Sequence, residues 1–233
     1  MIYKLGKYKK NDPMSVLVCE NYPALPVMSR FGIAMGFGDK TIDEVCRENG
    51  VDTDTFLVVI NLLLDEDTAE AVDAPFSIEA VVQYLHNSHD YFLNFRLPAI
   101  RRSLLAAIDC GQKDVSFAIL CFFDEYADEV RKHMTYEEQT VFPYVRDLLA
   151  GREITGEYSI DVFSRQHDSV EMKLVELKNI LIKYYPAASS NELNAVLFDI
   201  FTCEQDLASH NRIEDALFVP AIKAIEQKRR AAL

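Results

Sequence analysis

From residue 77 onward the chain repeats apolar and polar positions with helical periodicity in four long runs. Three short breaks separate these runs, at 110–114, 150–156 and 185–189. Each run has about 25 to 40 residues, which is long enough for a helix that spans a domain. Because short connections make neighbouring helices antiparallel, the pattern predicts an up-down-up-down four-helix bundle over 77–230.

The first 72 residues show shorter helical patterns that glycine and proline interrupt. They predict helices at 13–20, after Pro23, at 41–49 and at 53–64. The segment 31–40 holds three of the eight glycines, which predicts a turn with positive φ. The acidic stretch 65–75 predicts a linker. We therefore expect an all-α protein with a small helical N-terminal domain over 1–72 and the bundle after it.

Charge and composition narrow the possible partners. The net charge of −13 and the pI of about 4.8 repel phosphate backbones, so we expect no nucleic-acid partner. No stretch approaches the roughly 20 apolar residues of a membrane span, and the opening residues lack the apolar run of a signal peptide. The five cysteines are scattered and never spaced as C-x-x-C, which is typical of reduced thiols. We expect a cytoplasmic protein with no membrane partner.

The five histidines all lie in the bundle half, and their pattern repeats. His133 and His210 each begin a His-x3-Glu-x5-Pro motif, which ends at Pro143 and Pro220. A lone histidine precedes each motif by almost the same number of residues, His89 in the first half and His167 in the second. The bundle is therefore predicted to consist of two related helix pairs.

This pattern suits a metal centre because residues four apart share a helix face, about 6 Å apart along the axis. Four imidazoles and two carboxylates could hold two ions, with room left for oxo, hydroxo or small-molecule ligands. Such donors suit iron or manganese, whereas structural zinc more often recruits thiolates. The predicted ligands are His89, His133, Glu137, His167, His210 and Glu214.

Other interpretations of the same residues remain. Histidine and glutamate four apart often form only a local ion pair, so the protein could be a purely structural bundle. His86 lies three residues before His89 and competes with it as a ligand. Asp90 and Glu171 are second-tier candidates, either as ligands or as groups that orient an imidazole through its other nitrogen.

The segment 77–226 resembles the hemerythrin-like HHE cation-binding domain, in the version found in repair-of-iron-centres di-iron proteins. Residues 133–143 and 210–220 are similar to the second-helix and fourth-helix motifs of that family, and Gln166-His167-Asp168 is similar to the third. The stretch 84–89, followed by Leu97-Pro98, is similar to the first and favours His89 over His86 as ligand. The first 65 residues or so resemble the small helical domain that precedes the bundle there.

The resemblance implies two iron ions with an oxo or hydroxo bridge, with manganese or zinc less favoured. It implies a role in nitrosative or oxidative stress, a small diatomic or peroxide ligand, and support for the repair of iron–sulfur centres, with an iron–sulfur client protein and a homodimer as candidate partners. The family's vicinal cysteine pair is replaced by Gly36-Phe37, which puts thiol chemistry in doubt. The alternative is an oxygen or nitric oxide sensor or carrier without turnover, and whether the protein is an enzyme stays open.

Overall fold

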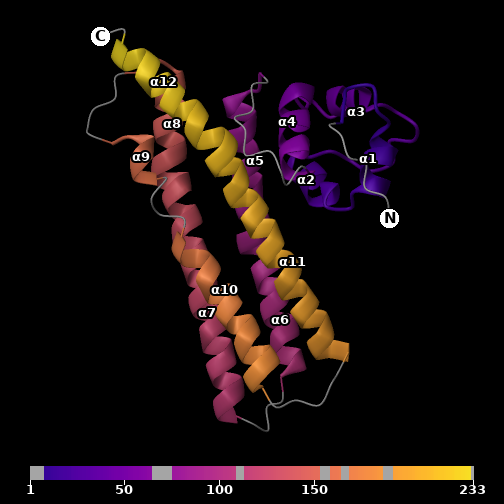
Figure 1. Ribbon diagram of the computed structural model, residues 1–233, viewed down its shortest axis with the longest axis vertical. Coiled ribbons are helices and arrows are strands. Elements are labelled where there is room, and N and C mark those ends of the chain that lie inside the picture. The colour runs from indigo at the N-terminus through magenta and orange to yellow at the C-terminus, as the bar shows by residue number, and fades with distance from the viewer. Residues whose placement is uncertain are drawn as a thin grey trace. The chain divides into compact units, whose positions relative to one another are not determined.

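A computed structural model of the protein describes residues 8–64, 75–108, 113–152, 158–163, 168–185 and 191–231, with the backbone alone at 113–114 and 168–173. Every regular element within these ranges is a helix (Figure 1). The only β-type pairing in these ranges is one isolated bridge between Pro13 and Thr41. The all-α prediction is therefore confirmed. The chain divides into two compact units, Met1–Ser88 with Arg212–Leu233, and His89–Asn211.

The N-terminal helices follow the predicted ranges closely. They are α1 (Met14–Glu20), α2 (Ala24–Arg30), α3 (Ile42–Glu48) and α4 (Thr53–Leu64). Helix α3 begins one residue later than predicted because Thr41 is its N-cap. The Thr41 hydroxyl accepts a hydrogen bond from the Glu44 backbone N–H at 3.3 Å, and the Glu44 carboxylate accepts one from the Thr41 N–H at 2.8 Å. This reciprocal capping box fixes the helix start.

The glycine-rich turn between α2 and α3 has the predicted backbone. Gly32, Gly36 and Gly38 have φ values of 73°, 91° and 60°, a region that residues with a side chain rarely adopt. Most of the predicted linker, 65–74, lies outside the described residues. The predicted domain boundary there accordingly stays a prediction.

Within the first unit, the end of α2 contacts helix α5 (Ile78–Asp90). The Asn87 side-chain amide donates a hydrogen bond to the Arg30 carbonyl oxygen at 2.7 Å. The Phe31 and Tyr84 rings lie 4.9 Å apart, and both α2 and α5 thus contribute to one packed interface. The same unit contains η4 (Glu214–Phe218) and α12 (Val219–Ala231).

The second unit contains the four-helix arrangement. Its elements are η1 (Tyr91–Arg96), α6 (Leu97–Ala107), α7 (Lys113–Tyr136), η2 (Glu137–Val141), α8 (Phe142–Leu149), α9 (Ile160–Phe163), α10 (Asp168–Asn179), η3 (Ile180–Tyr184) and α11 (Asn191–Ile213). Helix α7 packs against α6 and α10. Helix α11 closes the ring, since Glu204 pairs with Lys178 of α10 and Asp199 pairs with Arg96 of η1 at 3.0 Å. The chain direction alternates between neighbours, as predicted (Figure 1).

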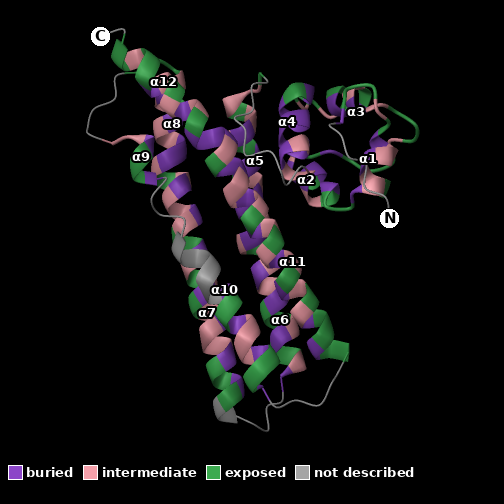
Figure 2. Cartoon of the chain, viewed as in Figure 1, coloured by how far each residue is buried: buried purple, intermediate pink, exposed green. Residues whose placement is uncertain are grey.

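An apolar core fills the space between these four helices. Phe92, Phe123, Leu177 and Ile200 are among its side chains, each no more than 1% exposed. Burying one such side chain stabilises the fold by roughly 1.5–3 kcal/mol. Figure 2 shows buried and exposed positions alternating along α7 and α11, as amphipathic helices require. Among the described residues, no helix has both the length and the hydropathy of a membrane span.

The long helical runs contain π-helical turns that the sequence did not predict. Four such segments, η1 to η4, lie within them, and the helix continues through η1, η2 and η4. The third run contains α9 and α10, and the residues between these two helices, 164–167, lie outside the described part of the chain. The helical bundle is confirmed.

Candidate metal centre

Four of the six predicted ligands lie together in the interior. His89, Glu137, His210 and Glu214 each offer one ligand atom, and these four atoms lie within 4.8 Å of one another. His89 is 3% exposed and the other three residues are fully buried. His210 and Glu214 are four residues apart along one continuous helix, so both side chains leave it on the same face.

The Glu137 carboxylate lies between two imidazoles. Its Oε2 is 3.1 Å from Nε2 of His89, and its Oε1 is 2.9 Å from Nε2 of His133. The His133 side chain is 11% exposed, so it lies at the edge of the buried group. A carboxylate with one oxygen toward each imidazole brings oxygen and nitrogen donors together at one place where a metal ion could bind.

Both glutamates of the repeated motif begin a π-helical segment that a proline follows. Glu137 opens η2 before Pro143, and Glu214 opens η4 before Pro220. In each segment the glutamate carbonyl accepts a hydrogen bond from the backbone N–H five residues later. A proline has no N–H and its ring clashes with the carbonyl four residues before it, which a wider π turn relieves. The glutamate-to-proline spacing, which occurs twice in this chain, therefore determines the local backbone that presents each carboxylate.

Aromatic rings hold the imidazoles in place. His89 stacks on Phe142 with ring centroids 5.5 Å apart and planes 6° apart. His133 stacks on Phe163 at 6.1 Å and 13°. The His210 ring meets His89 edge to face at 5.2 Å. These contacts restrict ring rotation and keep water away from the buried carboxylates.

Comparison with known families agrees with this geometry. The hemerythrin HHE cation-binding domain matches residues 80–222, more than half of the chain. The chain belongs to this family. No curated protein matches it. Since all six predicted ligands fall inside the matched range, the hemerythrin-family match and the buried group indicate one and the same metal-binding helical bundle.

The donor set of this hemerythrin-family protein fits a metal ion. Burying a carboxylate away from water costs free energy unless an opposite charge lies beside it. A cation bound among these side chains would supply that charge. The mixture of imidazole nitrogen and carboxylate oxygen suits iron or manganese. Among the described cysteines, none belongs to the group, unlike the thiolate-rich sites of structural zinc.

The remaining candidate ligands of this hemerythrin-family chain are either exposed or outside the described residues. His86 and Asp90 are exposed, and Asp90 accepts a hydrogen bond from the Asn94 amide at 2.7 Å. Burial thus favours His89 over His86 as the metal ligand. His167 lies outside the described residues, as does the side chain of Glu171, so both assignments stay predictions.

Sequence reasoning missed Glu138. Its Oε1 lies 2.7 Å from Nδ1 of His89. Burial lowers the pKa of His89, but the hydrogen bonds and charges of Glu137 and Glu138 act in the opposite direction and raise that pKa above its usual value. The available signal was the second glutamate directly after the predicted ligand, because ligating histidines commonly donate their other N–H to a carboxylate.

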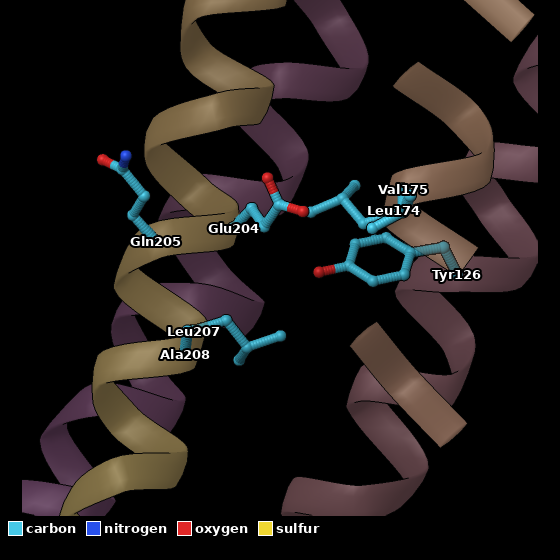
Figure 3. A pocket seen from close by; sticks show the side chains of 7 residues that line it. All are labelled: Tyr126, Leu174, Val175, Glu204, Gln205, Leu207 and Ala208. Atoms are coloured by element: carbon cyan, nitrogen blue, oxygen red, sulfur yellow. The ribbon is translucent and has the colours of Figure 1, made fainter. Parts of the chain in front are cut away.

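A cavity of about 310 Å³ lies between α7, α10 and α11 in the second unit (Figure 3). Its lining is largely apolar and consists of Tyr126, Leu174, Val175, Glu204, Gln205, Leu207 and Ala208. Figure 3 shows Leu207 and Glu204 extending from α11 toward α7 and α10, while Gln205 points away from them. Leu207 precedes His210 by three residues, about 4.5 Å along a helix axis.

Proposed function

We propose that the chain binds two iron ions in the bundle and takes a small diatomic molecule or a peroxide as ligand, in a nitrosative and oxidative stress response that supports the repair of iron–sulfur centres. The proposed ligands are His89, His133, Glu137, His167, His210 and Glu214. The observation that carries this proposal is the Glu137 carboxylate between His89 and His133, inside a fully buried group.

Each residue has a distinct part in the proposal. Glu137 and Glu214 would supply carboxylate oxygens to the irons, and the imidazoles would supply neutral nitrogen donors. Iron, when bound, would supply Lewis acidity and electrons to the small ligand. The Phe142 ring covers one face of His89, and the pocket lined by Leu207 lies against α11, the helix that also carries His210.

A second candidate function is an oxygen or nitric oxide sensor or carrier without turnover. Two observations favour it. The Gly36-Phe37 dipeptide offers no thiol, and burial raises the pKa of the Cys46 thiol to about 12. The Asn87 bond to the Arg30 carbonyl connects the N-terminal helices to α5, the helix that carries His89.

Metal analysis and optical spectra of the anaerobically purified protein test the proposal. We expect about two iron ions per chain after reconstitution. We also expect an absorption change on adding oxygen or nitric oxide. His86→Ala is the matched control, because His86 is exposed and should leave both readings unchanged. Fewer than about one iron per chain in the reconstituted wild type contradicts the proposal.

A second measurement separates the two candidate functions. The iron-loaded protein is incubated with a metal-free iron–sulfur protein, with and without nitric oxide treatment. Transfer of iron supports the repair function. Reversible spectral changes over repeated cycles, with all iron retained, support the sensor or carrier.

A further inference from the structure

We propose that Glu138 is a positioning residue, which holds His89 with its proton on Nδ1 and leaves Nε2 as the metal-binding nitrogen. The link to metal rests on the proposed function. The hydrogen bond itself rests only on the geometry of the protein. No motif of the sequence assigns Glu138 a part in the site.

The two nitrogens of His89 face two different carboxylates. Nδ1 is 2.7 Å from Glu138 Oε1, and Nε2 is 3.1 Å from Glu137 Oε2. A neutral imidazole carries one N–H, so only one of the two contacts can be its hydrogen bond. The Glu138 contact is the shorter, and the Glu138 side chain is 32% exposed whereas Glu137 is fully buried. Because the shorter contact is the better hydrogen bond, we place the proton on Nδ1.

One segment supplies both parts of this arrangement. Glu137, Glu138 and Phe142 all belong to η2 and the first residue of α8. Phe142 stacks on His89 with planes only 6° apart, which fixes the plane of the imidazole ring, and the carboxylate on each side of the ring determines which nitrogen faces it. The same short stretch therefore offers a ligand carboxylate and also orients a ligand that comes from α5.

The second copy of the motif lacks an equivalent glutamate. Asp215 follows Glu214, has a side chain one methylene shorter, and is exposed. We assign orientation by the adjacent carboxylate to the first copy, on the contact between Glu138 and His89.

The test uses Glu138→Ala, Glu138→Gln and a matched control, Asp128→Asn, which alters an exposed acid on α7. Nitrogen-15 NMR of the metal-free protein at a pH where His89 is neutral reports its tautomer, with His89→Gln to assign the signals. We expect Nδ1–H in the wild type and in Asp128→Asn, and a shift of population to Nε2–H in Glu138→Ala. Glu138→Gln keeps an acceptor oxygen and should retain most of the Nδ1–H form.

Anaerobic Fe²⁺ titration against a chelator gives the second reading. We expect binding to weaken by about 10- to 100-fold in Glu138→Ala and by less in Glu138→Gln. Asp128→Asn should match the wild type. Should Glu138→Ala not fold, the smaller loss in Glu138→Gln is the remaining test, and an affinity equal to that of the wild type overturns the proposal.

Two results distinguish this inference from the proposed function. A wild-type His89 protonated on Nε2, or a tautomer ratio that Glu138→Ala leaves unchanged, overturns the positioning role. A tautomer that responds to Glu138 in a protein that binds no Fe²⁺ supports the hydrogen bond and overturns the di-iron function instead.

Discussion

The two copies of the His-x3-Glu-x5-Pro motif share a backbone but differ in their surroundings. In both copies the glutamate is fully buried, opens a π segment and is followed by a proline. His133 of the first copy is 11% exposed at the edge of the group, whereas His210 of the second is fully buried. The acid after the glutamate contacts His89 in the first copy and is exposed in the second. Motif spacing thus determines the local chain path, while neighbouring helices determine what each side chain meets.

The largest expected difference between the copies concerns the carboxylates. We expect Glu137→Gln to weaken Fe²⁺ binding by at least ~100-fold, because two imidazoles lie against its carboxylate, and Glu214→Gln to have about a tenfold smaller effect. Metal titration measures both. Equal losses in the two variants would show that the copies are functionally equivalent. The metal-free Glu137→Gln protein should be at least as stable as the wild type, because a buried charge is gone.

The histidines of the two copies should differ in how much each contributes to the free energy of unfolding. In the metal-free protein we expect His210→Ala to lower the free energy of unfolding by about 2–3 kcal/mol, because it leaves a cavity at a fully buried position. His133→Ala should lower it by only about 1 kcal/mol, because the edge position lets the structure relax or admit water. Urea denaturation measures both values. A larger loss from His133→Ala would contradict the burial argument.

The prolines test the feature that both copies share, which is the π segment between the glutamate and the proline. Pro143→Ala and Pro220→Ala each restore a backbone N–H and remove the clash that the π turn relieves. If the turn reverts to α-helix, the preceding glutamate rotates away from the group, so we expect Fe²⁺ affinity to fall about tenfold in either variant. Helix content should stay unchanged in circular dichroism. An effect in only one copy would show that tertiary contacts, and not the proline, maintain the other π segment.

The smallest expected effect concerns ligand binding through the pocket beside α11, the helix that carries His210 of the second copy. Ala208→Phe places a ring in the space beside Leu207 and should slow the binding of nitric oxide or oxygen by about two- to threefold in stopped-flow absorption. Iron content should not change. Gln205→Ala is the control, because Gln205 points away from the other lining side chains (Figure 3). An unchanged rate in Ala208→Phe would mean that the ligand arrives by another route.

Helical periodicity was enough to predict the all-α class, the bundle and the starts of α1, α3 and α4 to within a residue or so. It could not reveal the π segments, because the apolar pattern of a run with one π turn differs little from that of an α-helix. The prolines at 98, 143 and 220 were the visible signal, since each follows a π segment by one or two residues.

The spacing of histidines and glutamates placed six residues in one predicted group, and four of the six, His89, Glu137, His210 and Glu214, lie together. Glu138 could not be found this way, because its contact with His89 joins two helices whose relative rotation the sequence does not state. The same holds for the greater exposure of His133, which depends on what covers the edge of the group. The part played by His167 remains a prediction.

Each π turn also has a genetic meaning, since it accommodates one more residue than the α-helical turn it replaces. Losing a single codon within η2 would return that stretch to ordinary α-helix and would leave the helix beyond it, which begins at Phe142, in nearly the same register. Phe142 would then keep its place against His89, whereas the direction of the side chains within η2, which include Glu137 and Glu138, would change. A one-residue deletion in η2 is therefore expected to act on the two acids of that turn and to spare the helix after it.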